Sequence, residues 1–399
     1  MIKKLIIFFI KFILFMALLF VKILKPVFSI KCGFTGLTRI GDIYHLDWYL
    51  SEKKIQNISS FDIFFYNDPK KLANQQWKKM WSKNVCLINT HFVILSILIN
   101  FQKNNFFNNC FIIDTLLSSY EINVTSKINF NWALQNTIPN ISFTKEEEAY
   151  GFKLINKLGI PNDCKFVCIH NRDSAYLDST NPYPNVDWGY HKFRDFSIKD
   201  FKLTIDKLIQ RGYFVIRMGS IVKEHLNYSD KKYIDYSNSI YQSDFLDIFL
   251  SSKCKFFISS DSGISAIPEV FKVPVVNVNK TLLRGMHRWS HKSIFIFKKY
   301  YSLKEDRYLK FDEIAKLKIG DVNTNEYLEE MNIEVHDNTD EDIMRASIEM
   351  DDFIDGRLSY SYYDNKIQRL FWNILKPNDL RSNFFRIGKY YIRNNKSLL

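Results

Sequence analysis

Residues 243–279 read SDFLDIFLSSKCKFFISSDSGISAIPEVFKVPVVNVN. An amphipathic stretch that opens with Ser243, a residue type that caps helices, is followed by an apolar run, a turn of small residues, a second amphipathic stretch and a second apolar run. Short apolar runs between amphipathic stretches are typical of strands buried between helices. The segment therefore predicts a helix–strand–helix–strand unit, and right-handed crossovers of this length connect parallel strands.

The same alternation continues on both sides of this unit. Thr144 and Glu147 have the spacing of a helix-capping box, and Gly159 and Pro161 are residue types that end a helix. An α/β fold with parallel strands is therefore predicted for most of the chain. The predicted strands are 61–67, 84–90, 165–170, 213–219, 233–237, 254–260 and 273–279, and the predicted helices are 70–81, 144–158, 196–212, 243–253, 262–272 and 338–353.

The composition narrows the class of protein. The chain has 399 residues, is 46% hydrophobic, and carries a net charge of +12 from 55 basic and 43 acidic residues. Residues 1–40 hold seven basic residues and no acid, so the remaining 359 residues have 48 basic and 43 acidic side chains, a net of +5. This balance disfavours nucleic-acid binding. The six cysteines are scattered without a CxxC pair, which favours a reducing compartment.

The first 28 residues, MIKKLIIFFIKFILFMALLFVKILKPVF, predict a membrane helix that Pro26 ends. At about 100° per residue, four lysines fall on one face, as in a helix that lies in the membrane interface. A spanning anchor and a cleaved signal peptide are the alternatives, although no small-residue cleavage site follows the apolar run. The lysines that share the face are Lys4, Lys11, Lys22 and Lys25.

Candidate ligand-binding residues follow the predicted strands. In an open parallel sheet, ligands bind beyond the carboxyl ends of the strands. Arginines, hydroxyls and a helix N-terminus converge at that edge here, and these groups suit an anion such as a pyrophosphate. The predicted substrate-binding residues are Arg172, Arg217, Gly219, Ser260, Asp261, Ser262, Gly263 and Glu269.

Several of these residues have a structural alternative. The SSDSG turn at 259–263 is either a phosphate cradle or an ordinary helix cap. Arg172 binds phosphate or pairs with its neighbour Asp173, and Arg217 needs an anionic partner that is either ligand or protein. Glu269 either accepts from a ribose hydroxyl or is exposed to solvent.

Two residues are candidates for acid–base catalysis from their positions alone. His170 ends an apolar strand and is either catalytic or structural. Asp42, in the stretch TRIGDIYHLDWYL, is either a general base that activates an acceptor hydroxyl or a helix cap. His287 and His291 have i, i+4 spacing, but no third ligand is visible, so no metal site and no cofactor are predicted.

The chain resembles a family of bacterial glycosyltransferases tied to surface-polysaccharide gene clusters. The resemblance covers residues 36–355 and is strongest over 165–280. HNRD looks like the His-x-Arg element of fucosyltransferase-like enzymes, whose arginine holds the donor diphosphate and would here be Arg172. SSDSG looks like the donor-binding turn of heptosyltransferase-like enzymes. The motifs are HNRDSAYL (170–177), YHKFRDFSIKDF (190–201), RGYFVIRMG (211–219), SDFLDIFLSSKCKFFISSDSG (243–263) and VFKVPVVNVN (270–279).

The resemblance implies a GT-B-like α/β fold of two facing Rossmann-like domains. The domains would be a membrane helix at 1–28, an acceptor-side domain at 31–160, a nucleotide-sugar domain at 161–375 and a basic helical tail at 376–399. The family often has histidine at the position of Asp42, which leaves Asp42 and Asp173 as equal candidates for the base.

The function implied is metal-independent transfer of a sugar from a nucleotide-activated donor to a lipid-linked or membrane-bound glycan. The protein would act in surface polysaccharide synthesis at the cytoplasmic face of the cell membrane, as a peripheral or single-span protein. A GT-B-type nucleotide-sugar epimerase and a non-catalytic, membrane-tethered assembly factor are the alternatives. An epimerase would act without an acceptor, and a scaffold would bind no nucleotide.

Overall fold

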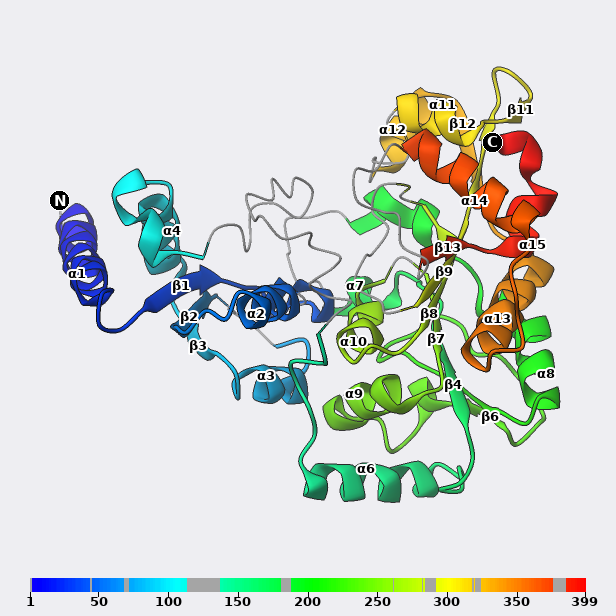
Figure 1. Ribbon diagram of the computed structural model, residues 1–399, viewed down its shortest axis with the longest axis horizontal. Coiled ribbons are helices and arrows are strands. Elements are labelled where there is room, and N and C mark those ends of the chain that lie inside the picture. The colour runs from blue at the N-terminus through cyan, green and yellow to red at the C-terminus, as the bar shows by residue number, and fades with distance from the viewer. Residues whose placement is uncertain are drawn as a thin grey trace. The chain divides into compact units, whose positions relative to one another are not determined.

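The computed structural model describes residues 2–43, 45–67, 72–112, 137–180, 188–260, 262–281, 283, 292–317, 319, 324–375 and 385–399. The chain divides into two compact units, Met1–Phe143 (unit 1) and Thr144–Leu399 (unit 2) (Figure 1). The division comes before the helix at 145–157, whereas the sequence placed it after residue 160. That helix packs on unit 2, and its capping box lies at the start of the unit.

Unit 1 contains a parallel three-stranded sheet in the order β1-β2-β3. Trp77 and Trp81 lie fully in its core, as does Phe64 of the central strand. The predicted helix at 70–81 begins only at Gln75, because the Asn74 side chain caps it by accepting from the Trp77 N–H at 2.8 Å. The elements are α1 (Ile2–Leu24), β1 (Ile30–Phe34), η1 (Ile40–Ile43), α2 (His45–Ile55), β2 (Phe61–Tyr66), α3 (Gln75–Trp81), β3 (Cys86–Asn89), α4 (Phe92–Gln102) and η2 (Asn105–Cys110).

Unit 2 is built on a seven-stranded sheet in the order β13-β9-β8-β7-β4-β5-β6, in which every neighbouring pair is parallel. The parallel sheet predicted from the alternation of apolar and amphipathic stretches is confirmed. The strands are β4 (Phe166–Ile169), β5 (Phe214–Arg217), β6 (Tyr233–Asp235), β7 (Phe257–Ser259), β8 (Val275–Lys280), β9 (Ser293–Phe297) and β13 (Phe385–Ile387).

Helices cover both faces of this sheet (Figure 1). α8 and α13 lie on one face and α9 and α10 on the other, as the crossovers of a doubly wound sheet require. α6 packs on α9 at Gly151, where any side chain would meet the ring of Phe249, because an added Cβ would lie 2.3 Å from it. The helices are α6 (Lys145–Lys157), α7 (Ala175–Thr180), α8 (Lys202–Gln210), α9 (Asp244–Lys253), α10 (Ala266–Val270), α11 (Phe311–Lys316), α12 (Asn325–Glu330), α13 (Asp340–Ile354), α14 (Tyr362–Leu375) and α15 (Lys389–Asn394).

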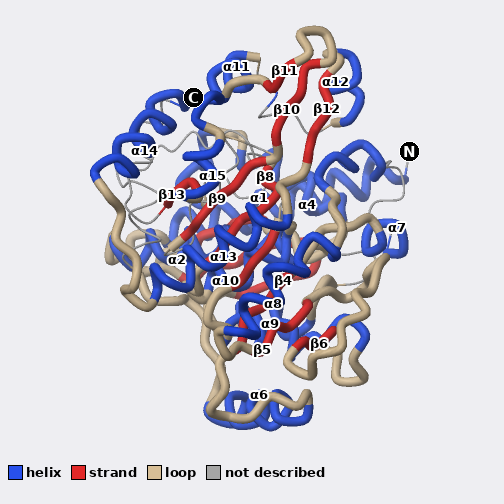
Figure 2. Tube along the Cα trace, turned by 90° about the vertical axis from the view of Figure 1, so that its right-hand side faces the viewer, coloured by secondary structure: helices blue, strands red, loops and turns tan. Residues whose placement is uncertain are grey.

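The carboxy-terminal part of unit 2 differs from the prediction. Residues 385–399 are not a basic helical tail, because β13 joins the edge of the main sheet and Tyr391 of α15 is buried. An antiparallel sheet in the order β11-β10-β12 was not predicted, and Figure 2 shows it near α11 and α12. Its strands are short and pair across a turn at 303–306. They are β10 (Lys299–Ser302), β11 (Arg307–Tyr308) and β12 (Ile333–His336).

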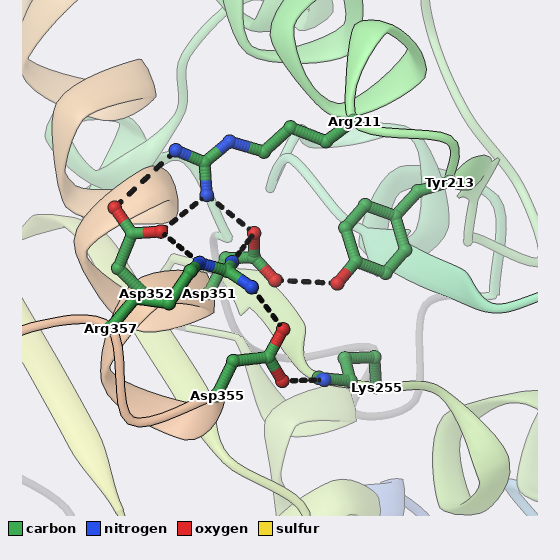
Figure 3. A network of polar contacts seen from close by, with 7 residues as sticks. All are labelled: Arg211, Tyr213, Lys255, Asp351, Asp352, Asp355 and Arg357. Atoms are coloured by element: carbon green, nitrogen blue, oxygen red, sulfur yellow. Dashed lines mark hydrogen bonds and ion pairs between the residues drawn. The ribbon is translucent and has the colours of Figure 1, made fainter.

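Charged residues lock α8 and α13 together at the amino-terminal edge of the sheet (Figure 3). The buried Asp351 accepts from Arg211 at 2.6 Å, from Arg357 at 2.8 Å and from the Tyr213 hydroxyl at 2.5 Å. Lys255, which precedes β7, pairs with Asp355 beyond the end of α13. Since three cations face three carboxylates, the network is neutral and holds the helix layer to the strands.

The substitution Asp351→Asn should lower the free energy of unfolding by about 2 kcal/mol. Asparagine keeps the shape but leaves two guanidinium groups without their buried charge, and the cost is below that of a fully buried pair because both arginines are partly exposed. Urea denaturation at pH 7 measures the effect. Asp352→Asn is the matched control, since Asp352 is more exposed and should lose less than 1 kcal/mol. Equal losses of unfolding free energy in the two variants would contradict the central role of Asp351 in this network.

Candidate functional site

The order of strands in the main sheet reverses beside β4. The chain runs from β4 outward to β5 and β6, then returns to the other side of β4 to continue through β7, β8 and β9. Open α/β sheets bind ligands at this reversal, beyond the carboxyl ends of the strands. The residues that follow β4 and β7 meet there: the His170 N–H donates to the Ile258 carbonyl at 2.9 Å, and the Arg172 N–H donates to the Ser260 hydroxyl at 3.3 Å.

Arg172 follows β4 at this reversal, and its side chain is 10% exposed. It pairs with Asp195, not with its neighbour Asp173. Burial raises the pKa of the Asp195 carboxyl, and the Arg172 charge opposes that rise. Asp195 was not predicted as a site residue, because it follows Arg172 by 23 positions and reaches it only through tertiary structure.

Lys298, a second residue missed by the sequence, holds the segment that carries Asp195. Its ammonium group is 2% exposed and donates to the carbonyls of Phe193 and Asp195, each at 2.8 Å. It also pairs with Asp337 at 2.6 Å. Its position, directly after the buried strand β9, is the signal that could have found it, since a cation that leaves a buried strand needs anionic or carbonyl partners.

The partners of Arg217 are protein groups and not a ligand, which is the second of the two alternatives that the sequence left open. The side chain is fully buried and donates to the Glu224 carbonyl at 2.5 Å and to the Asn171 Oδ1 at 3.3 Å, and it lies 3.4 Å from Asp235. Asn171 in turn donates to the Phe196 carbonyl at 3.1 Å. Arg217 therefore positions the segment next to Arg172 and is not itself open to a ligand in this structure.

Gly219 shapes the turn after β5. Its φ of +149° lies in the region that favours glycine, and an added Cβ would lie 2.7 Å from a methyl group of Val222. Its carbonyl accepts from Gln242 at 2.6 Å. These contacts give Gly219 a role in backbone geometry.

The two catalytic candidates in unit 2 are held differently. Burial and the charges of Arg217 and Arg172 lower the pKa of His170 to about 3, so its imidazole is neutral at pH 7. Its Nδ1 has no hydrogen-bond partner among the described residues. Asp173 accepts from the Ala175 N–H at 3.0 Å, at the start of α7, and from the Lys223 N–H at 2.9 Å. Both carboxylate oxygens of Asp173 thus already accept backbone donors.

The serine-rich turn follows β7 closely. Ser260 is 1% exposed, and its carbonyl accepts from the Ser262 N–H at 2.7 Å. The single helix expected at 262–272 is instead a 3-10 turn, η6 (Gly263–Ser265), followed by the five residues of α10. A helix this short has little macrodipole, so hydroxyl and backbone donors of the turn matter more. Asp261 lies outside the described residues.

Glu269 of α10 is a buried carboxyl group. It is 1% exposed, which excludes the solvent-exposed alternative, and neither carboxylate oxygen has a hydrogen-bond partner in the described part of the chain. Burial raises its pKa to about 8, and the charges of Lys280 and Lys272 oppose that rise. A buried acceptor of this kind suits a ligand hydroxyl.

Asp42 belongs to unit 1. It lies in η1 and pairs with Arg39 at 3.0 Å, and its side chain is 19% exposed. Its side chain lies against Gly36, where an added Cβ would be 2.9 Å from the Cβ of Asp42. Asp42 is thus a partly exposed carboxylate in a fixed position within unit 1.

No group of three or more histidine, cysteine, aspartate or glutamate side chains that could hold a metal ion occurs among the described residues. His287 and His291 lie outside them. All six cysteines are free thiols.

No protein-family model and no curated protein matches the chain. Three solved structures similar to it are glycosyltransferases. The ADP-heptose LPS heptosyltransferase II of E. coli is 12% identical with a TM-score of 0.41, over 67% of this chain and 90% of that one. A family 9 glycosyl transferase from Veillonella parvula is 11% identical with a TM-score of 0.38, over 67% and 86%. The iron-containing dodecameric glycosyltransferase TibC from enterotoxigenic E. coli is 11% identical with a TM-score of 0.32, over 62% and 57%. Similarity at this level assigns no activity to this chain.

Proposed function

We propose that the protein is a glycosyltransferase that moves a sugar from a nucleotide-activated donor to a glycan acceptor. The observation that carries the proposal is the meeting of Arg172 and the Ser260 turn at the reversal of the parallel sheet. The buried Glu269, whose carboxyl oxygens have no hydrogen-bond partner among the described residues, adds a carbonyl oxygen that could accept from a hydroxyl of the donor.

The donor diphosphate would be held by Arg172 and by the hydroxyls and N–H groups of the serine turn. As the bond between the sugar and the diphosphate breaks, negative charge grows on the departing phosphate oxygen, and a guanidinium group fixed in a sparsely hydrated site stabilises it. Arg172 would exchange its Asp195 partner for the phosphate. Asn171, Arg217 and Lys298 would keep the surrounding segment in place.

A carboxylate would accept the proton of the acceptor hydroxyl while the acceptor oxygen forms its bond to the sugar carbon. Asp42 and Asp173 are the candidates. His170, neutral at pH 7, would donate or accept a hydrogen bond rather than carry charge. No bound metal is required in this scheme, since basic side chains and turn donors neutralise the leaving group.

The acceptor would be a lipid-linked or membrane-bound glycan of surface polysaccharide synthesis. α1 is long and apolar enough to cross a membrane, a property that it shares with signal sequences. A membrane contact through residues 1–28 at the cytoplasmic face would bring the site to such an acceptor.

Thermal unfolding of the full chain in detergent with ADP-, GDP-, UDP-, CMP- and dTDP-sugars tests the proposal. A ligand at 100 times its dissociation constant stabilises a protein by about 2.7 kcal/mol, so the matching donor should raise the midpoint of unit 2. Transfer that requires an acceptor would then distinguish a transferase from an epimerase. If no nucleotide shifts the midpoint, the protein is not a nucleotide-sugar enzyme.

A further inference from the structure

The N-terminal helix is part of the core of unit 1. Leu18 is 4% exposed and packs with Phe34, Phe107 and Phe111, while Leu14 and Val21 pack against the same cluster. The ring of Phe15 lies 5.4 Å from that of Phe107 in an edge-to-face contact. The second half of α1 is therefore seated on α4 and η2.

Polar contacts fix the same half of the helix. The Lys22 ammonium donates to the Phe106 carbonyl at 2.8 Å and lies 3.3 Å from the centre of the Phe106 ring. The Cys110 thiol donates to the Leu18 carbonyl at 3.8 Å. These contacts hold α1 along the surface of unit 1.

The unpacked part of α1 is too short to cross a bilayer. The whole helix would measure about 34 Å at about 1.5 Å per residue, but the part before the packed residues, Ile2–Ile13, measures only about 18 Å. The hydrocarbon core is about 30 Å thick. Spanning would thus require α1 to leave unit 1 and would expose Leu18 and the aromatic cluster beneath it.

The two faces of α1 differ in charge and in exposure. With Lys4 at 0° and about 100° per residue, the packed residues lie at about −100° to 20°, and Lys11 and Lys25 fall within the same sector. The opposite sector, about 80° to 180°, is wholly apolar and exposed. Its residues, with their exposed fractions, are Ile2 (73%), Leu5 (57%), Phe9 (55%), Phe12 (54%), Ile13 (63%), Met16 (47%), Phe20 (62%) and Ile23 (66%).

Charge indicates what covers this apolar sector. Residues 1–40 and 92–112, which contain α1 and the elements it packs on, hold eight basic residues and no aspartate or glutamate. In a helix that lies in the membrane interface, lysines on the side opposite the apolar face reach anionic lipid headgroups with their long side chains, while the apolar side chains enter the acyl region. A protein partner in water would have to bury the whole apolar sector, and this part of the chain offers no aspartate or glutamate to pair with basic groups of such a partner.

We infer that α1 lies in the plane of an anionic membrane, held to unit 1 by its lysine-bearing side and inserted into one leaflet by the sector Ile2–Ile23. This refines the membrane contact of the proposed function and is independent of sugar transfer. The donor titration above needs no membrane, so the failure of either idea is separable from the other.

Sedimentation of the full chain with phosphatidylcholine vesicles, with and without 30% phosphatidylglycerol (roughly the anionic share of a cell membrane), tests the contact. Binding should require the anionic lipid. Phe12→Glu together with Phe20→Glu should lower it at least tenfold, and Lys4→Gln with Lys11→Gln about 25-fold, at roughly fivefold per lysine. Ile240→Glu is the matched control, because Ile240 of unit 2 is 91% exposed and should not change binding. Equal binding by the Phe12/Phe20 variant would overturn the inference.

Depth measurements separate an in-plane helix from a spanning one. A fluorescent amino acid placed at position 5, 12 or 20 by codon suppression reports its depth through quenching by spin-labelled lipids. Three equal, shallow depths support the in-plane helix. Depths that differ from one position to the next, with position 12 near the bilayer centre, would show a crossing and overturn it.

Discussion

Replacing Arg172 by alanine is expected to lower the rate of sugar transfer about 1,000-fold, or about 4 kcal/mol in transition-state stabilisation. Arg172 lies at the reversal of the sheet and pairs with the Asp195 side chain. A diphosphate, which carries more negative charge than one carboxylate, can replace Asp195 in that pair. Its guanidinium would meet the charge that develops on the departing diphosphate. Initial rates with the donor found by thermal unfolding measure the effect, and urea denaturation should show a change of no more than about 2 kcal/mol.

Asp195→Asn distinguishes a ligand-binding role from a structural one. If Arg172 serves the donor, Asp195→Asn removes one carboxylate that competes with the donor for Arg172, and the donor should bind as well or better. If the pair only stabilises the fold, Arg172→Ala and Asp195→Asn should lower the free energy of unfolding by similar amounts, and neither should change donor binding. Arg172→Lys keeps the charge without the planar fork and should fall between the wild type and the alanine variant.

The substitution Glu269→Gln should remove a large pH dependence of stability. The folded-state pKa of Glu269 is about 8 against a usual 4.5, so the folded protein keeps a proton that the unfolded chain releases. Stability from this group is therefore full below about pH 4.5 and falls as pH rises through 8, by about 5 kcal/mol in total. Urea denaturation of the wild type and the variant between pH 5 and 8.5 gives the difference.

Glu349→Gln is the matched control for Glu269. Glu349 is also buried, and burial raises its pKa to about 7, but it accepts from the Tyr360 hydroxyl at 2.9 Å and from the Lys389 N–H at 2.6 Å. Both variants should flatten the pH profile. Only Glu269→Gln should also weaken donor binding, by about tenfold, because only that carboxylate is proposed to accept a donor hydroxyl. An unchanged profile for Glu269→Gln would show that its proton is not held in the folded state.

The strands around the site were predictable because their signals are local. β4, β5, β7 and β8 each contain an apolar run bounded by turn or helix residues. Because parallel strands end at the same edge of a sheet, Arg172 and the Ser260 turn are expected at one edge. β13 was not predictable in this way. Its three residues become a strand only because they pair with β9, which is a tertiary contact.

The sequence could not predict which residues contact the charged side chains of the site. Arg217 was predicted to need an anionic partner, either ligand or protein. Only the fold shows that its hydrogen-bond partners are the Glu224 carbonyl and the Asn171 Oδ1. Asp195 meets Arg172, and Lys298 meets the Asp195 carbonyl, through loops whose paths no short motif encodes. The burial of Glu269 likewise depends on how α10 packs, since five residues carry too little pattern to predict which side faces inward.

The seating of Leu18 on η2 has a consequence for synthesis of the chain. The Cys110 thiol that bonds to the Leu18 carbonyl lies 92 positions later, which at usual rates of translation is about 5 to 18 s. During that interval the leader has emerged from the ribosome without the aromatic cluster that will hold it. Capture by the secretion machinery and docking onto unit 1 therefore compete in time, and slower translation of residues 30–110 should divert more of the nascent protein into translocation.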